Sequence, residues 1–229
     1  MGLYSSTIQR LCYAQSHVIG DLIVCVATEL EGILLRPHVP VLCTGVGAVN
    51  AAYSLTRYLE RESASGVIVC GIAGAYPQAF SDGGLGLGSV VCADSECYGD
   101  LGANDSNGNF LDMRALGFPV IPGPPEPIYN LLPMGIFPAE RRARFVTMNT
   151  CSGGDEDARR LESRTGGSVE SMEGAAIAHV ATLFGIPCGE IRAISNRAGN
   201  RDRNSWRVKE AAAAAQEALL AWCRSDGIK

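Results

Sequence analysis

The sequence predicts an α/β protein of one domain with a mixed, mostly parallel central sheet. Short β-branched runs alternate along the chain with segments of helical pattern, the order expected when helices connect neighbouring parallel strands. The chain has 229 residues and is 47% hydrophobic, which is enough to bury a sizeable core. We expect residues 21–229 to form the domain, and residues 1–20, which carry no clear pattern, to be an N-terminal extension.

Six apolar runs are the predicted strands, because each is short and rich in the β-branched residues that favour a sheet. They cover residues 21–27, 39–45, 65–74, 88–94, 144–150 and 188–195. Four helices are predicted over residues 49–61, 155–164, 172–184 and 205–224. Alanine is frequent in the last of these, and Ser205 is its expected N-cap.

The stretch between residues 101 and 138 is heavy in Gly, Pro and Asn and includes the run PGPPEP. These residues favour turns and disfavour regular structure, so the stretch predicts an irregular loop. Such a loop is too long for a mere connection and is expected to serve a site or an interface.

Charge and hydropathy exclude several classes of protein. The net charge of −5 argues against a nucleic-acid partner, which would require a basic patch. No apolar run approaches the roughly 18 residues that cross a bilayer, so no membrane partner is expected. The N-terminus lacks a basic flank followed by a long apolar stretch, so we expect no signal peptide and a cytoplasmic protein.

The metal-binding residue types are poorly placed for a metal site. The chain has nine cysteines, but none lies in a Cys-x-x-Cys pair, and Cys25 and Cys70 fall inside strand-like runs where a thiol behaves as a small hydrophobe. None of the three histidines is spaced with a carboxylate or cysteine as a metal requires. We expect no metal, no cofactor and a reducing compartment.

Polar residues and glycines gather where the predicted strands end, which is where ligands bind in open α/β sheets. The first strand is followed by Glu29 and Glu31, which would point to one side if the strand continued. The third runs into GIAGAYP, whose glycines allow close approach of the backbone to a ligand. The remaining strand-end side chains are Glu96, Tyr98 and Asp100 after the fourth strand, and Arg192, Ser195 and Asn196 in the sixth.

Common nucleotide and hydrolase motifs are missing or incomplete. Gly45-Val46-Gly47 suggests a dinucleotide-binding turn, but Asn50 stands in place of the third glycine and no acidic residue follows at the end of a next strand about 20 residues later. A G-x-S-x-G motif and a P-loop G-K-[ST] are both absent from the sequence. These observations disfavour a nicotinamide enzyme, a serine hydrolase and a P-loop protein.

Glu173 opens a helical run of small and apolar residues, and it has two interpretations. Ser168 or Ser171 could cap the helix, with the acids in a first turn whose dipole favours negative charge. Alternatively, Glu173 is a partly buried acceptor for the hydroxyl groups of a ligand. The residues of this stretch leave both open.

Four motifs together resemble the purine nucleoside phosphorylase and nucleosidase superfamily. They are TGVGAVNAAYSLTRYLE, GIAGAYP, SMEGAAIAHVATLFGIP and IRAISNRAG, and in order and spacing they are similar to those of methylthioadenosine/S-adenosylhomocysteine nucleosidases. Two details are closer to the futalosine hydrolases: YGDLGA after the fourth strand, and Asn196 where methylthioadenosine nucleosidases carry aspartate. The resemblance implies a three-layer α/β/α, nucleoside phosphorylase-like fold and a homo-oligomer, most simply a dimer.

The resemblance also implies roles for individual residues. Glu173 would hold the ribose 2′- and 3′-hydroxyls, and Glu31 would orient and deprotonate the attacking water, unless both Glu29 and Glu31 merely start a helix. Asn196 would read the base, unless it only caps the turn in SNRAGN. Catalysis is assigned to Glu31, Glu173 and Asn196, and substrate binding to Ala73, Gly74, Met172, Glu173, Ser195 and Asn196.

The activity implied is hydrolysis of the N-glycosidic bond of futalosine, a purine nucleoside, with water as co-substrate and release of hypoxanthine for menaquinone biosynthesis. Neither ATELEG nor GIAGAYP supplies an arginine for phosphate, which favours hydrolysis over phosphorolysis. A methylthioadenosine/S-adenosylhomocysteine nucleosidase is the alternative enzyme. A catalytically silent nucleoside-binding protein is the third possibility, because Asn196 removes a possible acid.

Overall fold

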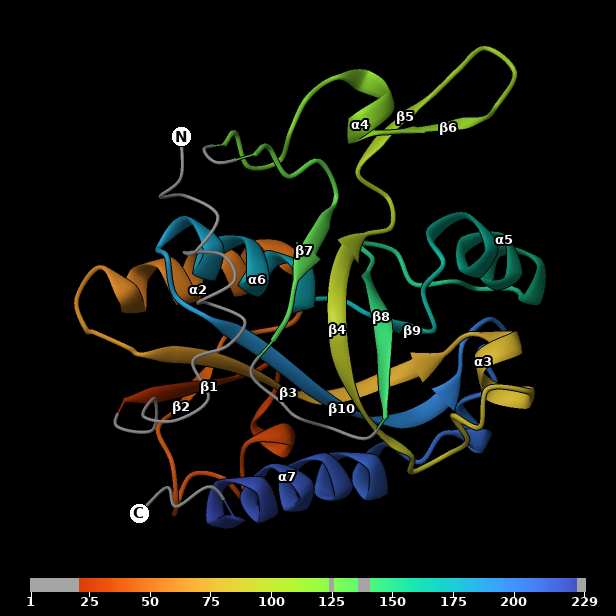
Figure 1. Ribbon diagram of the computed structural model, residues 1–229. Helices are drawn as coiled ribbons and strands as arrows, with labels where there is room; N and C mark the ends of the chain where they lie inside the picture. The colour runs from red at the N-terminus through yellow and green to blue at the C-terminus, as the bar shows by residue number, and fades with distance from the viewer. Residues whose placement is uncertain (1–20, 124–125, 136–140, 226–229) are drawn as a thin grey trace.

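The computed structural model describes residues 21–123, 126–135 and 141–225. Most strand pairs of its main sheet are parallel (Figure 1). The proposed extension at 1–20 lies outside these residues. The strands are β1 (Leu22–Val26), β2 (Val41–Cys43), β3 (Gly66–Ala75), β4 (Val90–Tyr98), β7 (Leu131–Pro133), β8 (Arg142–Thr147), β9 (Val169–Ser171) and β10 (Cys188–Arg197). All six predicted strands are therefore present.

The sheet has the order β10-β4-β8-β9-β3-β1-β2, with β7 beside β4. Five pairs are parallel: β1–β2, β1–β3, β3–β10, β4–β8 and β8–β9. Since β10 pairs with β3 as well as with β4, the strands β3, β10, β4, β8 and β9 close into a ring. The closure is possible because β3 is long: residues 66–69 pair with β1, and residues 74 and 75 pair with β9. The mixed, mostly parallel sheet is confirmed.

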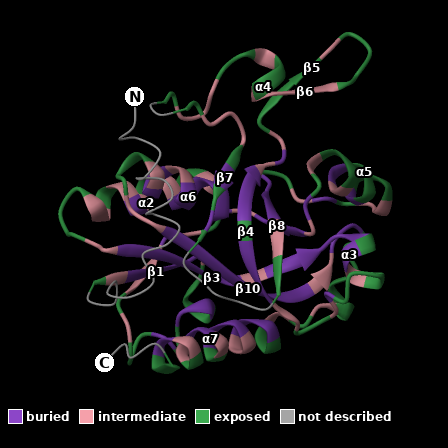
Figure 2. Ribbon diagram, in the orientation of Figure 1, coloured by how far each residue is buried: buried purple, intermediate pink, exposed green. Residues whose placement is uncertain are grey.

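Helices cover the sheet on two sides. On one side, α2 (Ala48–Leu59) and α6 (Gly174–Leu183) lie against each other, and on the other, α7 (Val208–Ser225) packs on β10 and β3 (Figures 1 and 2). Side chains of β3 alternate between the two layers, with Val67 and Val69 in the core under α6, and Ile68 and Cys70 in the core over α7. Burial on both faces explains the unbroken apolar run, and the three-layer α/β/α fold is confirmed.

The smaller helices α3 (Pro77–Ser81) and α5 (Asp155–Thr165) pack on each other at one end of the sheet. The Glu162 carboxylate of α5 accepts hydrogen bonds from the N–H groups of Gln78 and Ala79, at 3.0 and 2.9 Å. These are donors of the first turn of α3, which would otherwise lack partners. The contact fixes the segment that follows β3.

The predicted irregular loop at 101–138 is wrong in part, and residues 124–125 and 136–138 of it lie outside the described residues. Strands β5 (Gly102–Asn104) and β6 (Phe110–Asp112) form a hairpin, followed by α4 (Met113–Leu116) and then by β7 on the edge of β4 (Figure 1). The Arg164 guanidinium of α5 lies over the Phe110 ring, 3.8 Å from its centroid. These elements are too short to produce a periodic pattern in the sequence.

The predicted start of the last helix is also wrong. Ser205 belongs to a short 3-10 turn, η2 (Arg203–Ser205), where its hydroxyl donates to the Asp202 carbonyl. Helix α7 begins at Val208.

Within residues 21–123, 126–135 and 141–225, none of the helices combines the length and apolar character that a bilayer span requires.

Gln216 joins α7 to the segment after β1. It is 1% exposed, its Oε1 accepts from the Leu34 N–H at 2.8 Å, and its Nε2 donates to the Leu30 carbonyl at 3.1 Å. Both backbone groups lie beside Glu31. The single amide therefore satisfies a donor and an acceptor of an irregular segment, and it holds that segment on the helix.

We expect Gln216→Leu to lower the free energy of unfolding by about 2 to 4 kcal/mol, because it leaves the Leu34 N–H and the Leu30 carbonyl unpaired. Urea denaturation followed by circular dichroism measures the change. Glu217→Ala is the control, since Glu217 is the exposed neighbour on the same helix and should change stability by less than about 0.5 kcal/mol. An equal, small effect of both substitutions would remove Gln216 from this role.

Candidate active site

The predicted binding residues of β3 and β10 lie side by side at the carboxyl ends of these strands. Ala73 pairs with Ile194 and Gly74 with Asn196, so that Ser195 is an extra residue in a β-bulge. The Ser195 hydroxyl is buried, 2.7 Å from Asn196 Oδ1 and 3.2 Å from the Ala73 carbonyl. A bulge redirects the side chains around it, and bulges are common beside active sites.

Glu31 lies in a 3-10 turn, η1 (Glu29–Glu31), that follows β1. Its carboxylate is buried: Oε2 accepts from the Thr28 N–H at 3.0 Å and the Thr28 hydroxyl at 2.8 Å, and Oε1 accepts from the Ile72 N–H at 3.0 Å. Glu29 is exposed and pairs with Arg36 at 2.7 Å. The two acids therefore do not point to one side, because β1 ends at Val26 and the chain turns.

Gly71 is the residue that gives the Glu31 carboxylate its place. A Cβ built on Gly71 would lie 2.5 Å from Glu31 Oε1 and 3.2 Å from Arg192 Nη1. The first distance is too short for a carbon–oxygen contact, and the second is tight for a carbon–nitrogen contact. The glycine of GIAGAYP therefore serves close approach, as predicted, although in this structure the approaching groups belong to the protein itself.

Glu173 is the N-cap residue of α6, yet its side chain makes no capping bond. Oε1 accepts from the Gly47 N–H at 3.0 Å, and Oε2 accepts from Arg192 Nη2 at 3.2 Å. The Gly47 N–H can point at this carboxylate because the Gly45-Val46-Gly47 turn places Gly47 at a φ of 95°, a conformation that favours glycine.

The prediction that Ser168 or Ser171 caps this helix is wrong. Ser171 belongs to β9, and its hydroxyl has no hydrogen-bond partner in the described part of the chain. The cap comes instead from Thr147 on β8, whose Oγ1 accepts from the Ala175 N–H at 2.8 Å. Since another strand caps the helix, the Glu173 carboxylate is left for Gly47 and Arg192.

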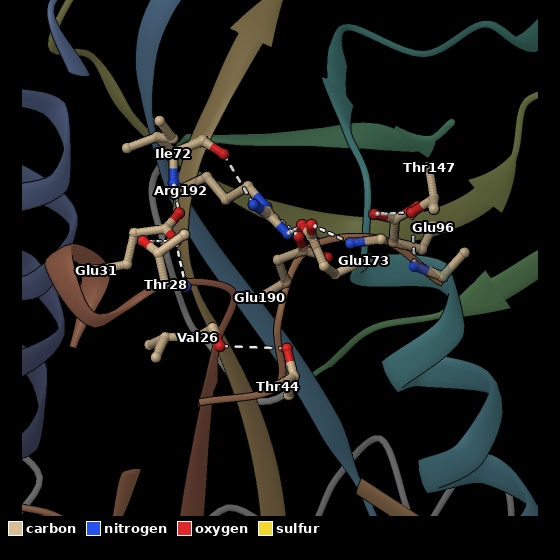
Figure 3. A network of polar contacts seen from close by, with 12 residues as sticks. Val26, Thr28, Glu31, Thr44, Ile72, Glu96, Thr147, Glu173, Glu190 and Arg192 are labelled. Atoms are coloured by element: carbon tan, nitrogen blue, oxygen red, sulfur yellow. Dashed lines mark hydrogen bonds and ion pairs between the residues drawn. The ribbon is translucent and has the colours of Figure 1, made fainter. Parts of the chain in front are cut away.

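The Arg192 guanidinium connects these groups (Figure 3). It is 2% exposed, and it donates to Glu190 Oε1 at 2.5 Å, to the Ile72 carbonyl at 2.8 Å and to Glu173 at 3.2 Å. The backbone of Ile72 thus donates its N–H to Glu31 and accepts at its carbonyl from Arg192. Burial alone would lower the pKa of Arg192, but the charges of Glu190 and Glu173 raise it above its usual range. Glu31 and Glu173 therefore belong to one connected network.

Asn196 and Met172 lie at the margin of this network and are both half-buried. The Asn196 amide donates to the Arg197 carbonyl at 3.2 Å, and its Oδ1 lies beside the Ser195 hydroxyl.

Asp100 of the YGDLGA motif accepts from the Asn149 N–H at 2.8 Å and is not part of the network. The Tyr98 hydroxyl is 3.1 Å from His179 Nδ1.

The sequence reasoning missed the role of four residues. Arg192 and Glu96 were recognised only as strand-end polar residues, while Glu190 and Thr147 were not singled out. The signal for Glu190 was present, since a Glu-x-Arg pair in an apolar strand places both side chains on one face. Thr147 carries no such signal, because its capping bond to α6 depends on how distant segments pack.

Comparison with known proteins identifies the family. The family model of the phosphorylase superfamily matches residues 28–224, nearly the whole of the predicted domain.

The chain belongs to the phosphorylase superfamily.

Curated proteins similar to this chain include futalosine hydrolases. A futalosine hydrolase of Thermus thermophilus is 34% identical, in an alignment that covers 80% of this chain and 80% of that protein. A futalosine hydrolase of Streptomyces coelicolor is 35% identical, with coverage of 78% and 75%. The resemblance predicted from the sequence is confirmed.

A solved superfamily structure has the same fold. The 5′-methylthioadenosine/S-adenosylhomocysteine nucleosidase of Helicobacter pylori superposes with a TM-score of 0.74, covering 91% of this chain and 100% of that chain at 17% identity. At that identity the likeness shows the fold alone. It agrees with the nucleoside phosphorylase-like architecture expected from the sequence.

We expect Arg192→Met to lower the free energy of unfolding by about 3 to 5 kcal/mol at neutral pH, because it leaves buried carboxylates without their cation. Without Arg192, the carboxyl pKa values in the folded state rise further, so the loss should grow with increasing pH and shrink in acid. Urea denaturation at several pH values measures it. Arg159→Met, which removes an exposed ion pair, should have almost no effect.

Proposed function

We propose that this chain hydrolyses the N-glycosidic bond of futalosine and releases hypoxanthine. One observation carries the proposal: two buried carboxylates, Glu31 and Glu173, lie in a single network at the carboxyl ends of the strands. The chain also belongs to the phosphorylase superfamily and is 34 and 35% identical to two futalosine hydrolases. Carboxylates accept hydrogen bonds from ribose hydroxyls and from water. Residues 21–229 would form the catalytic domain.

Glu173 is proposed to hold the ribose. Its carboxylate accepts from the 2′- and 3′-hydroxyls, with Met172 packed against the sugar and Ala73, Gly74 and Ser195 along the site. As the C1′–N9 bond breaks, the sugar gains oxocarbenium character, and the negative charge of Glu173 stabilises it. Arg192 and the Gly47 N–H fix the carboxylate in advance, so that little reorganisation is needed during the reaction.

Glu31 is proposed to bind the nucleophilic water and to accept its proton as the oxygen attacks C1′. The electron pair of the C1′–N9 bond leaves with the base, which takes up a proton to become hypoxanthine. The Thr28 and Ile72 N–H groups hold the carboxylate in one orientation. Arg192 is occupied by Glu190, Glu173 and the Ile72 carbonyl, an arrangement that favours water over phosphate as the nucleophile.

Asn196 is proposed to distinguish 6-oxopurines from 6-aminopurines. Its amide offers two N–H donors, and one can reach O6 or N7 of hypoxanthine as negative charge develops on the leaving base. The group is half-buried, its carbonyl oxygen is taken by Ser195, and one of its two N–H donors is taken by the Arg197 carbonyl, so the second N–H remains for the base. Methylthioadenosine carries an amino group at purine position 6. That amino group is a hydrogen-bond donor and cannot accept from the Asn196 N–H.

The proposed enzyme is a homodimer. Large apolar side chains are exposed on α2 and at the end of α6, two helices that contact each other: Val49 at 79%, Tyr53 at 62% and Leu183 at 61%. Neighbouring exposed apolar side chains of this kind mark an interaction surface.

We place the enzyme in the cytoplasm and in menaquinone biosynthesis, the pathway in which futalosine is consumed.

Hypoxanthine release from futalosine, followed by chromatography, tests the activity. We expect turnover by the unmodified protein and a loss of about 100-fold or more in Glu31→Gln, because the amide cannot accept the water's proton. Nucleoside binding should persist in Glu31→Gln and is measured by calorimetry. Glu29→Gln is the matched control, since Glu29 is exposed, and its turnover should be unchanged.

The alternatives give different results in the same assay. Release of adenine from methylthioadenosine at a higher kcat/KM than release of hypoxanthine from futalosine would favour a methylthioadenosine/S-adenosylhomocysteine nucleosidase. Tight nucleoside binding without release of any base would favour a silent binding protein. Near-normal turnover of Glu31→Gln would remove Glu31 from the mechanism.

We expect the unmodified enzyme to prefer futalosine over its 6-amino analogue, and Asn196→Asp to reduce that preference by about 10-fold or more. When a binding site offers a hydrogen-bond donor and the ligand also presents a donor, both buried groups stay unpaired. Each unpaired group weakens binding by about 1 to 3 kcal/mol. Measuring kcat/KM for both nucleosides with both proteins tests this. Equal efficiencies in the unmodified enzyme would show that Asn196 does not read the base.

A further inference from the structure

Two carboxyl groups lie together beneath the start of α6, outside the proposed substrate contacts. Glu96 of β4 and Glu190 of β10 are both fully buried, at 0% exposure. A Cβ on Gly174, the first residue of α6, would collide with an oxygen of each carboxyl group. The carboxyl pair and the helix backbone are therefore packed against each other with no room for a side chain at position 174.

The hydrogen bonds of the pair lead to Glu173 by two routes. Glu190 Oε1 accepts from Arg192 Nε, and the same guanidinium binds Glu173. Glu96 accepts from the Thr147 hydroxyl at 3.2 Å, and Thr147 caps α6, whose N-cap residue is Glu173. Both the side chain and the backbone of Glu173 are thus supported by the pair.

The donors available to the pair point to a proton between its members. Glu96 Oε2 also accepts from the Cys97 N–H at 3.0 Å, but Glu190 Oε2 has no donor among the N–H and hydroxyl groups of the described residues. A proton on Glu96 supplies that donor, through a hydrogen bond between the two carboxyl groups. Two adjacent carboxylates in a dry interior cannot both ionise.

We propose that Glu96 and Glu190 share one proton, and that the singly charged pair is a positioning device which anchors Arg192 and so holds Glu173 in place for the ribose. The proposal rests on the proposed nucleoside hydrolysis. Loss of the proton would give the pair a second negative charge, which draws Arg192 away from Glu173 and repels the Glu173 carboxylate.

The electrostatics agree with Glu96 as the protonated member. Burial raises the pKa of Glu96 well above its ordinary value, and the neighbouring charge of Glu190 raises it further. Burial also raises the pKa of Glu190, but Arg192 opposes this. The contact of Glu190 with Arg192 therefore favours Glu190 as the carboxylate and Glu96 as the acid.

Other ionisable groups face the pair from each packed element. They are Arg192 and Cys188 of β10, Cys92, Cys97 and Tyr98 of β4, and Glu173 before α6, while Glu31 faces Arg192 from η1. Burial raises the pKa of Cys92 to about 11 and that of Cys97 to about 12, and it raises the pKa values of Cys188 and Tyr98 as well. These four groups therefore stay neutral at neutral pH.

The sign of the pH effect follows from the raised pKa of Glu96. A carboxyl group whose pKa is higher in the folded state contributes most to stability below its ordinary value of 4.5, and the contribution is lost as pH rises through the folded-state pKa. Activity should follow the same direction. Turnover of the unmodified enzyme should fall on the alkaline side as the pair becomes doubly charged.

Two amide substitutions separate the roles. Glu96→Gln places a permanent N–H donor opposite Glu190 Oε2, so kcat at neutral pH should stay within about three-fold while the alkaline fall in kcat moves upward by about one pH unit or more. Glu190→Gln removes the charge that anchors Arg192, so kcat should fall by about 10- to 100-fold, with a much smaller change in KM. Glu162→Gln, a remote carboxylate that accepts two backbone N–H groups, is the control and should keep the unmodified pH profile.

The measurements are pH profiles of kcat and KM with futalosine, and thermal melts of the same proteins from about pH 6 to about pH 9. Coinciding alkaline limbs and coinciding melts of the unmodified enzyme and Glu96→Gln would overturn the shared proton. Normal kcat in Glu190→Gln would overturn the positioning role, and if that variant does not fold, Glu96→Gln still decides.

The experiment also distinguishes failure of the proposed function. If the unmodified protein releases no base from any nucleoside, the proposed function falls, and the melts still test the pair. A fall of the melting temperature with rising pH in the unmodified protein, absent from Glu96→Gln, supports the shared proton. Its presence in both proteins refutes it.

Discussion

The buried Arg192 guanidinium is the group on which the arrangement of the site depends. It joins the carbonyl of β3 at Ile72, the carboxylate of Glu190 on its own strand and the carboxylate of Glu173 at the start of α6. Through the Ile72 peptide it also reaches Glu31. A charge so far from water requires such partners, because an unpaired buried ion is strongly destabilising. The strands, the turn after β1 and the helix must therefore assemble together around this group.

The parts of the structure that were predictable from the sequence are those with local signals. Continuous apolar runs predicted the six strands. The rule that ligands bind at strand ends singled out Glu31, Ser195 and Asn196. The pairing of β3 with β10 explains why Ser195 and Asn196 lie beside Ala73 and Gly74. The buried position of Glu173 was one of the two interpretations of its apolar helical run, and the roles of Glu31 and Glu173 were implied by the resemblance to nucleosidases. In each case the pattern and the resemblance pointed the same way.

Features set by long-range packing could not be predicted in this way. The serines before α6 are ordinary capping residues, but residues 169–171 were recruited into β9, and Thr147, distant in sequence, took over the cap. Similarly, Ser205 precedes an alanine-rich run and still lies outside α7, because its hydroxyl bonds to Asp202. A capping propensity is a few tenths to about 2 kcal/mol, which tertiary contacts readily exceed.

The charge distribution of the site has a consequence for catalysis. Glu31, Glu173 and Glu190 are buried carboxylates around one guanidinium, so the network holds an excess of negative charge even with Glu96 protonated. A neutral nucleoside relieves little of that excess, whereas a sugar with oxocarbenium character supplies the missing positive charge. Interactions that strengthen only as the transition state forms raise kcat rather than ground-state affinity. In the proposed mechanism, the same excess that makes the folded network depend on Arg192 therefore favours the reacting sugar over the bound substrate.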